Sequence, residues 1–239
     1  MKPTLLLIFL LFLSIEGRRG FGRWKGLWTE EFHTSSLGEQ WKLDTDCSDC
    51  VSVTSRGQLR LSSPIETVSD ALNRTVRLTL KYPQDPSQYN QQGTAAPWKP
   101  PLRIEFRAKV PARSNMWVAV RLRPVESPAA PSLDIMTADG ATPWLITGAI
   151  KHSDEVQSET VDLKTRNLPN DVTMGFYNHV LMWTGESITW SVSEIEYLRV
   201  EASEMMKRIN TSETTEGYPL NWHDDAFYLD FIRLYQERD

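Results

Sequence analysis

Hydrophobic and polar residues alternate along most of the chain, and turn residues separate the alternating segments. The clearest cases are 102–110 and 117–123, where almost every second residue is apolar. This period of two is typical of β-strands that turn one face toward a core. Further strands are predicted at 51–53, 58–61, 76–80, 145–151, 179–183, 188–192 and 228–235. The pattern predicts an all-β antiparallel sandwich of two stacked sheets, with one helix expected at 194–208.

The first 17 residues have the pattern of a secretory signal peptide. Lys2 supplies a positive start, 5–13 an apolar run, and Gly17 a small residue for cleavage. The run is shorter than the about 20 residues that a spanning helix needs, and an uncleaved anchor is the alternative. We therefore expect a secreted, extracellular protein with a single domain at 18–239 and no membrane span after cleavage.

Sequons and cysteines fit an oxidising, extracellular compartment. Asn73 and Asn210 begin Asn-x-Ser/Thr sequons, where glycosylation is expected. Cys47 and Cys50 are the only cysteines, and acidic residues stand beside both. A zinc site would need two further ligands, and a redox motif would need surroundings that favour the thiolate, which neighbouring carboxylates oppose. The pattern favours a small local disulfide between Cys47 and Cys50.

The charge balance is acidic. The chain has 26 Lys and Arg against 31 Asp and Glu, a net charge of −5 at pH 7. Removal of 1–17 takes away Lys2 and Glu16 and leaves this net charge unchanged. Without a basic face, nucleic acid is not expected as a partner. The nine tryptophans and the 40% hydrophobic content are ample for one core.

Several segments match, in order, the motifs of one enzyme family. The stretch 104–111 resembles a strand written R-x-E-x-R-x-K-x-P, and 116–124 one written L-W-P-A-x-W-x-x-P. The stretch 179–188 is similar to Y-x-x-x-W-T-x-x-x-I, and 230–235 to D-Y-V-R-V-Y. The chain thus resembles glycoside hydrolase family 16, the endo-β-1,3- and β-1,3-1,4-glucanases and their non-catalytic relatives, the β-glucan recognition proteins. The resemblance covers nearly all of the expected mature chain. It implies a concanavalin A-like jelly roll of two curved antiparallel sheets, with a sugar-binding groove on the concave sheet.

The family's catalytic signature E-x-D-x-x-E falls on Ser132, Asp134 and Thr137. In an extended strand Ser132 and Asp134 share one face, and Thr137 joins them if Met136 is the extra residue of a β-bulge. A retaining glycosidase needs carboxylates at the two outer positions, as nucleophile and general acid. Serine and threonine can do neither job unaided, so the resemblance predicts loss of the family's hydrolase activity and no cofactor. Rescue would need a new carboxylate partner for Asp134.

The side chains left on the expected concave face suggest sugar binding. By strand parity Trp117 and Arg121 share that face with Asp134, and Arg121 stands where the family has its second tryptophan. Aromatic rings stack on the apolar faces of sugars, and Asp, Arg and His bond hydroxyl groups. The predicted binding residues are Trp117, Arg121, Asp134, Trp144 and His152. Each also has a structural interpretation: a packed aromatic, a histidine in a turn, or a solvated charge.

The resemblance also raises the question of a structural calcium ion. Asp230 stands where the family's C-terminal ligand would be, and Gly57 offers a backbone oxygen. Hard oxygen ligands suit calcium. One carboxylate specifies little, however, and the alternative is an aspartate that pairs with Arg233 or with water.

Three classes of function stay open. The first is a secreted, non-catalytic protein that binds a polysaccharide such as β-1,3-glucan. The second is a weak or altered hydrolase, which needs the new carboxylate. The third is a matrix or interaction protein, favoured if the concave face is filled by side chains or loops. The sequence does not determine the sugar or the oligomeric state.

Overall fold

The computed structural model describes residues 23–39, 41–44, 50–62, 77–80, 101–110, 112, 117–122, 132–152, 155–162, 175–201 and 226–238. Within these residues the chain forms strands β1 to β14, all in antiparallel pairs, and no α-helix. No helix in this part of the chain is long and apolar enough to cross a membrane. The predicted signal peptide, Cys47 and both sequon asparagines, Asn73 and Asn210, lie outside the described residues.

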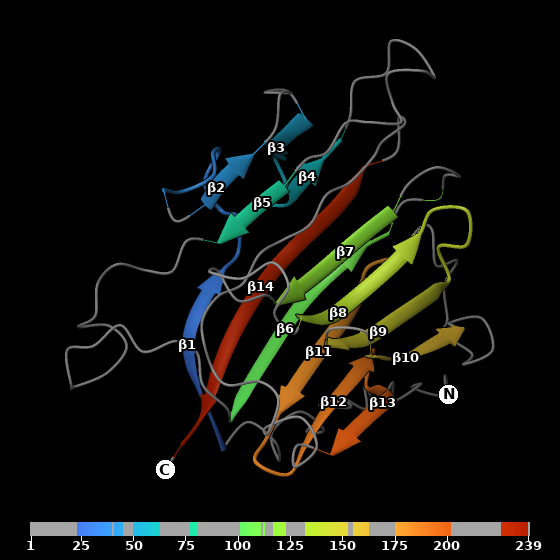
Figure 1. Ribbon diagram of the computed structural model, residues 1–239. Helices are drawn as coiled ribbons and strands as arrows, with labels where there is room; N and C mark the ends of the chain where they lie inside the picture. Colours follow the sequence, from blue (N-terminus) through green and yellow to red (C-terminus); the bar gives the residue numbers. More distant parts are fainter. Residues whose placement is uncertain are drawn as a thin grey trace, which may run out of the picture.

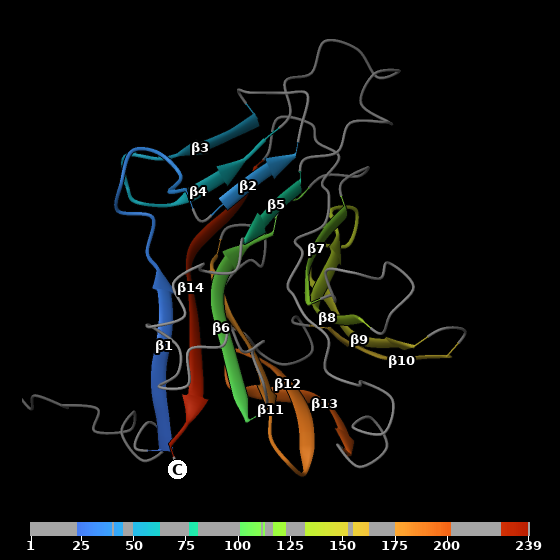
Figure 2. The same cartoon turned by 60° about the vertical axis from the view of Figure 1, so that its left-hand side comes forward.

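The strands form two stacked layers, seen edge-on in Figure 2, and a separate two-stranded antiparallel sheet. The large sheet runs in the order β13 (Ile195–Glu201), β12 (Ser187–Val192), β11 (Tyr177–Trp183), β6 (Leu102–Lys109), β14 (Phe227–Glu237), β4 (Leu59–Leu61), β3 (Val51–Val53). Strand β1 (Trp24–Glu30) also pairs with β14, along its C-terminal part. The small sheet runs in the order β10 (Glu155–Asp162), β9 (Leu145–His152), β8 (Ser132–Asp139), β7 (Trp117–Leu122). The pair consists of β2 (Trp41–Asp44) and β5 (Arg77–Leu80).

The core fills the space between the two layers, because each sheet turns its apolar positions toward the other. Ile104 and Phe106 of β6 and Leu181 of β11 contribute from the large sheet. Leu133 of β8 and Ile146 of β9 contribute from the small one. The apolar period of two in the sequence thus corresponds to one buried face per strand. The predicted sandwich of two antiparallel sheets is confirmed, and Figure 1 shows the curvature of both layers.

Every segment predicted as a strand is a strand, with ends that move by one or two residues. Strands β1, β2, β8 and β10 were not predicted from periodicity; for β8, an extended strand was assumed at the signature positions. The helix expected at 194–208 is wrong in its described part, where β13 pairs antiparallel with β12. A tight turn at Ser193 and Glu194 brings Ile195 opposite Val192, and strand pairing then outweighs local helix propensity.

The β12–β13 turn is held by two residues in the left-handed region, Ser193 at φ 45° and Glu194 at φ 71°. Two-residue hairpin turns with positive φ at both positions favour Asn-Gly, because a Cβ is strained there. The turn therefore carries local strain in a hairpin that the cross-strand pairs hold in place.

We predict that Glu194→Gly raises the free energy of unfolding by about 1 kcal/mol, since glycine relieves the left-handed strain. Urea denaturation measures the change. Glu186→Gly is the matched control, because Glu186 is an exposed glutamate in the neighbouring β11–β12 turn and does not have a positive φ. A Glu194→Gly protein no more stable than the control would contradict the strained-turn interpretation.

His179 is the one histidine that the described residues bury in the core. Its side chain is 1% exposed and its ring stacks on Phe106 with centroids 5.0 Å apart. Neither ring nitrogen has a hydrogen-bond partner within the described residues. Burial lowers the pKa of His179 from 6.5 to about 3, because the charged form loses its hydration. The folded protein therefore keeps this ring neutral.

His179 should make the protein sensitive to acid. Between pH 6.5 and 3 the unfolded chain binds a proton at this position and the native state does not, so stability falls as the pH drops through this window. We predict that His179→Leu removes up to about 1.4 kcal/mol of stability change per pH unit in this window. Urea denaturation between pH 4 and 8 measures it, with the exposed His33→Gln as control. Parallel pH profiles for wild type and His179→Leu would refute this role.

Candidate functional site

The site is built on a bulge in β8. Against β9, Asp134 pairs with Ala149 and Thr137 with Thr147, so β8 has one residue more than its partner. The predicted bulge is therefore confirmed, but its detail differs: against β7 the residue without a partner is Ile135, because Met136 pairs with Val120. Both Ile135 and Met136 face the core. The bulge leaves Ser132, Asp134 and Thr137 on the opposite side, which we call the outer face of the small sheet.

Two side chains of the large sheet support the bulge from below. A bulge interrupts the ladder of backbone hydrogen bonds and leaves carbonyl groups that need donors. The indole Nε1 of Trp190 on β12 donates to the carbonyl of Asp134 at 2.9 Å. The hydroxyl of Tyr197 on β13 donates to the carbonyl of Ile135 at 3.4 Å. Burial raises the pKa of Tyr197 far above its ordinary value, so the hydroxyl keeps its proton.

Gly148 of β9 makes room for this support. A Cβ at Gly148 would lie 2.7 Å from Cδ1 of Trp190 and 2.9 Å from the Tyr197 hydroxyl. Contacts that close are not tolerated, so a larger residue would push both donors away from the bulge. Trp190 lies in the segment 188–192, which the alternation of the sequence predicted as a strand. Tyr197 was missed because its segment was assigned to a helix.

Asp134 forms a buried ion pair with Arg121. The guanidinium Nε lies 2.7 Å from Oδ1, and Nη2 donates to Oδ2 at 3.2 Å. Asp134 is 1% exposed and Arg121 6%. The Nη2–Oδ2 contact is a charge-assisted hydrogen bond, and the short Nε–Oδ1 contact adds attraction between the opposite charges. Two predicted binding residues are thus brought together, but as partners of each other.

The chain of contacts continues from Arg121 to Trp117. The guanidinium carbon lies 5.1 Å from the centre of the Trp117 ring, within range of a cation–π contact. Trp117 is 39% exposed and, with Leu43, one of two exposed large hydrophobic residues in the described part of the chain. Across the strand pair, Trp117 stands opposite Asp139. Asp139 is exposed, and its Oδ1 accepts a hydrogen bond from the amide of Ala141 at 2.8 Å.

The two outer signature positions offer no carboxylate. Ser132 is buried at the start of β8, opposite Lys151 of β9. Thr137 is partly buried, and its hydroxyl donates to the carbonyl of Thr147 at 3.4 Å. A hydroxyl at either position does not titrate near neutral pH and carries no charge to stabilise a cationic transition state. Neither of these two side chains can therefore act unaided as the nucleophile or the proton donor of a retaining glycosidase.

The other two predicted binding residues are Trp144 and His152. Trp144 lies in the β8–β9 turn, is partly buried and packs against the core, which agrees with its structural interpretation. The backbone of His152 ends β9, and its side chain lies outside the described residues. The described site therefore consists of Trp117, Arg121, Asp134 and Asp139, with Ser132 and Thr137 beside them.

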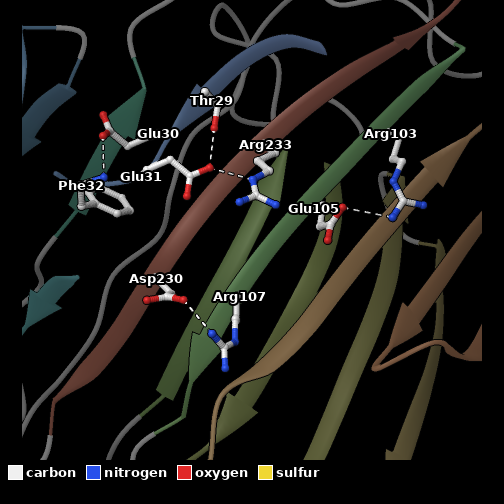
Figure 3. Close-up of polar contacts among 9 residues, drawn as sticks. All are labelled: Thr29, Glu30, Glu31, Phe32, Arg103, Glu105, Arg107, Asp230 and Arg233. Atoms are coloured by element: carbon white, nitrogen blue, oxygen red, sulfur yellow. Dashed lines mark hydrogen bonds and ion pairs between the residues drawn. The ribbon is translucent and has the colours of Figure 1, made fainter. Parts of the chain in front are cut away.

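The surroundings of Asp230 do not fit calcium. Figure 3 shows its carboxylate facing Arg107, whose Nη1 lies 2.9 Å from Oδ2, and the amide of Gln58 donates to Oδ1 at 3.1 Å. A guanidinium in contact opposes a cation at the same oxygen. Arg233 pairs with Glu31, so the expected alternative partner was wrong too. Within the described residues no group of three or more His, Cys, Asp or Glu could hold a metal.

Gly57 and Cys50 have local structural roles. Gly57 adopts φ 70° in the β3–β4 turn, where its amide donates to the carbonyl of Thr54 at 3.0 Å. Cys50 is buried in the core and is not a free thiol. Its predicted partner, Cys47, lies outside the described residues, so the Cys47–Cys50 pairing stays a prediction.

Two proteins of known activity are similar in sequence to this chain, although no family model matches it. Glucan endo-1,3-beta-glucosidase A1 of Niallia circulans is 23% identical over 226 residues, which cover 85% of this chain and 32% of that protein. A glucan endo-1,3-beta-glucosidase of Cryptopygus antarcticus is 24% identical over 197 residues, 74% of this chain and 69% of that protein. The chain thus spans about a third of the length of the Niallia protein.

Solved structures show the same architecture. The catalytic domain of an endo-1,3-beta-glucanase (laminarinase) from Thermotoga petrophila superposes with a TM-score of 0.69 at 17% identity, over 90% of this chain and 99% of that one. SCLam, a non-specific endo-beta-1,3(4)-glucanase from family GH16, has a TM-score of 0.67 at 18% identity, over 91% and 92%. The described strands have the layered arrangement of these sandwiches. The chain therefore has the sandwich fold of these laminarinases, and its motifs resemble those of glycoside hydrolase family 16.

Proposed function

We propose that this protein is a secreted, non-hydrolytic polysaccharide-binding protein, with β-1,3-glucan as the candidate ligand. The observation that carries the proposal is the outer face of the small sheet. Ser132 and Thr137 flank Asp134 without a carboxylate, and Arg121 holds Asp134 in a buried ion pair. Asp134 is 1% exposed, so its carboxylate is withdrawn from the surface and poorly placed to act on a sugar as base or nucleophile.

The nearest described carboxylate on the same face does not restore a catalytic pair. Asp139 lies five residues after Asp134 on β8, with the bulge between them. At roughly 3.3 Å per residue their Cα atoms are separated by about 13 Å or more. Glycosidases need carboxyl groups about 5–5.5 Å apart for retention or about 6.5–9.5 Å for inversion. This geometry argues against the altered-hydrolase alternative for the described residues.

Polysaccharide binding is supported by Trp117 and by the relatives. Exposed tryptophan rings stack on the apolar faces of sugar rings, and Asp139 beside Trp117 offers an acceptor for hydroxyl groups. Both proteins that are similar in sequence are glucan endo-1,3-beta-glucosidases. The apolar start of the sequence and its sequons support secretion.

An interaction scaffold without sugar binding is the second candidate. One observation favours it: the centre of the outer face is covered, since Ser132, Ala119 and Ala149 are buried although they do not face the core. A long groove along β7 and β8 is not consistent with that burial. Binding would then be confined to the end of the sheet that carries Trp117.

We predict that the purified protein releases no reducing ends from laminarin or mixed-linkage glucan, because Ser132 and Thr137 offer neither a nucleophile nor a proton donor at the signature positions. The assay compares the native protein with a heat-denatured sample of the same preparation. Asp134→Asn is the informative variant: hydrolysis by the wild type that this variant abolishes would sink the non-hydrolytic proposal.

We predict that Trp117→Ala weakens glucan binding by on the order of 1–3 kcal/mol, since the variant loses the stacking surface. Binding is measured by retention on insoluble β-1,3-glucan, and folding by thermal unfolding of the same samples. Leu43→Ala is the matched control, because Leu43 has almost the same exposure, 40%, and lies on β2 outside the two main sheets. Equal retention of the two variants, or none by the wild type across an array of glucans, chitin and galactans, would favour the interaction scaffold.

A further inference from the structure

The contacts around Trp117 imply a specific role for the aspartate that the family signature retains. Asp134 is ion-paired with Arg121, and the guanidinium of Arg121 in turn lies over the ring of Trp117. The three side chains form one connected row that starts inside the sheet and ends at an exposed indole. In a row of this kind, the buried Asp134 can fix the position of the Arg121 guanidinium, and the guanidinium can fix the orientation of the exposed Trp117 ring.

The strand geometry shows what this row requires. Residues 117 and 121 are four positions apart on β7, roughly 13 Å along an extended strand. The side chains of Arg121 and Trp117 have to lean toward each other along the strand, over the position of Ala119, to bring the guanidinium to the ring. Ala119 shares that face and is buried, which agrees with cover by the side chains on either side. A larger residue at 119 would occupy the same space.

The contact also determines which part of the indole a ligand can reach. The guanidinium lies over the ring, so that face of the indole is taken. The rest of the side chain supplies the 39% exposure. The result is a platform that can stack a sugar on one side only.

The charge next to this platform is negative. Arg121 and Asp134 neutralise each other, whereas Asp139 lies exposed and directly opposite Trp117 in the β7–β8 pair. Side chains opposite each other in an antiparallel pair have Cβ atoms about 4.5–5.5 Å apart. A sugar stacked on Trp117 therefore lies beside a carboxylate that accepts hydroxyl hydrogens and repels anionic groups.

We propose that Arg121 and Asp134 are positioning residues that hold Trp117 as a one-sided stacking platform for uncharged glycan chains, and that Asp139 disfavours polyanionic ones. This inference rests on the proposed polysaccharide binding. It assigns the retained aspartate a role in recognition, and it makes the guanidinium, in place of a second tryptophan, part of the binding site.

The positioning role is tested by removing both charges together. Arg121→Leu with Asp134→Leu replaces the pair by apolar groups, whereas either single change would leave a buried charge without its partner. The readout is the indole N–H signal of Trp117 in a ¹H–¹⁵N spectrum, assigned with Trp117→Phe. We expect this signal to move and broaden in the double variant, and laminarin affinity to fall by about the factor that Trp117→Ala causes. Arg199→Leu with Glu196→Leu, which removes an exposed ion pair on β13, is the matched control.

The selectivity is tested with laminarin and carboxymethylated laminarin, compared by calorimetry at low and high salt. We expect the anionic polymer to bind about fivefold more weakly at low salt, a difference that shrinks as salt screens the charge. Asp139→Asn should remove most of it, without a change in the Trp117 signal. Equal affinity of the wild type for both polymers at low salt would overturn the role of Asp139.

The failure of the positioning role and the failure of the proposed function are distinguishable. An unchanged Trp117 signal in a folded double variant that still binds laminarin as the wild type does overturns the positioning role alone. No binding of either polymer by the wild type overturns the polysaccharide function, and the platform with it, whatever the spectra show. A double variant that changes the Trp117 signal and loses laminarin supports both.

Discussion

The small sheet depends on how the bulge in β8 satisfies its backbone. One extra residue on β8 turns Ile135 and Met136 into the core and Asp134 and Thr137 to the other side. The freed carbonyls would be costly in a dry interior. Trp190 and Tyr197 reach across from the large sheet to bond them. The chemistry of the outer face is therefore fixed by donors from the opposite layer.

The same constraint explains why Gly148 is needed. The two layers approach so closely beneath the bulge that no side chain fits between β9 and the indole of Trp190. The bulge in β8, Gly148 and the two donors depend on one another. The bulge needs the donors for its carbonyl groups, and the donors reach those groups only because Gly148 has no side chain. A change at any of them would alter the position of Asp134 through its backbone, although none of them lies on the outer face.

The effect of an ion pair on the stability of this protein depends on whether the pair is exposed or buried. On the outer side of the large sheet, Arg233 pairs with Glu31 and Arg107 with Asp230, all partly exposed. Such pairs are screened by water and are worth little. Arg121 and Asp134 are withdrawn from water, so loss of one partner would leave a buried charge alone. Their pairing also withdraws the signature aspartate from the surface and brings the guanidinium over the ring of Trp117.

Much of the fold could be predicted from the sequence, because alternation of apolar residues is a local signal. The segments 102–110 and 117–123 carried it clearly, and each became a strand with one buried face. The segment after Ser193 did not, since its strand exists only because a strained turn pairs it with β12. Local propensity contains no information about that partner.

For the candidate site, too, some features could be predicted from the sequence and others could not. The residues at the positions that resemble the signature, Ser132, Asp134 and Thr137, could be read from the sequence, and strand parity placed Trp117 and Arg121 on one face with Asp134. The pairing of Arg121 with Asp134 and the guanidinium over the ring of Trp117 could be seen only in the folded structure. The same holds for the contacts of Asp230 with Arg107 and Gln58. Strand parity fixes the side on which a residue lies. Which polar groups meet there depends on distances across strands and on the exclusion of water, and these exist only once the layers are packed.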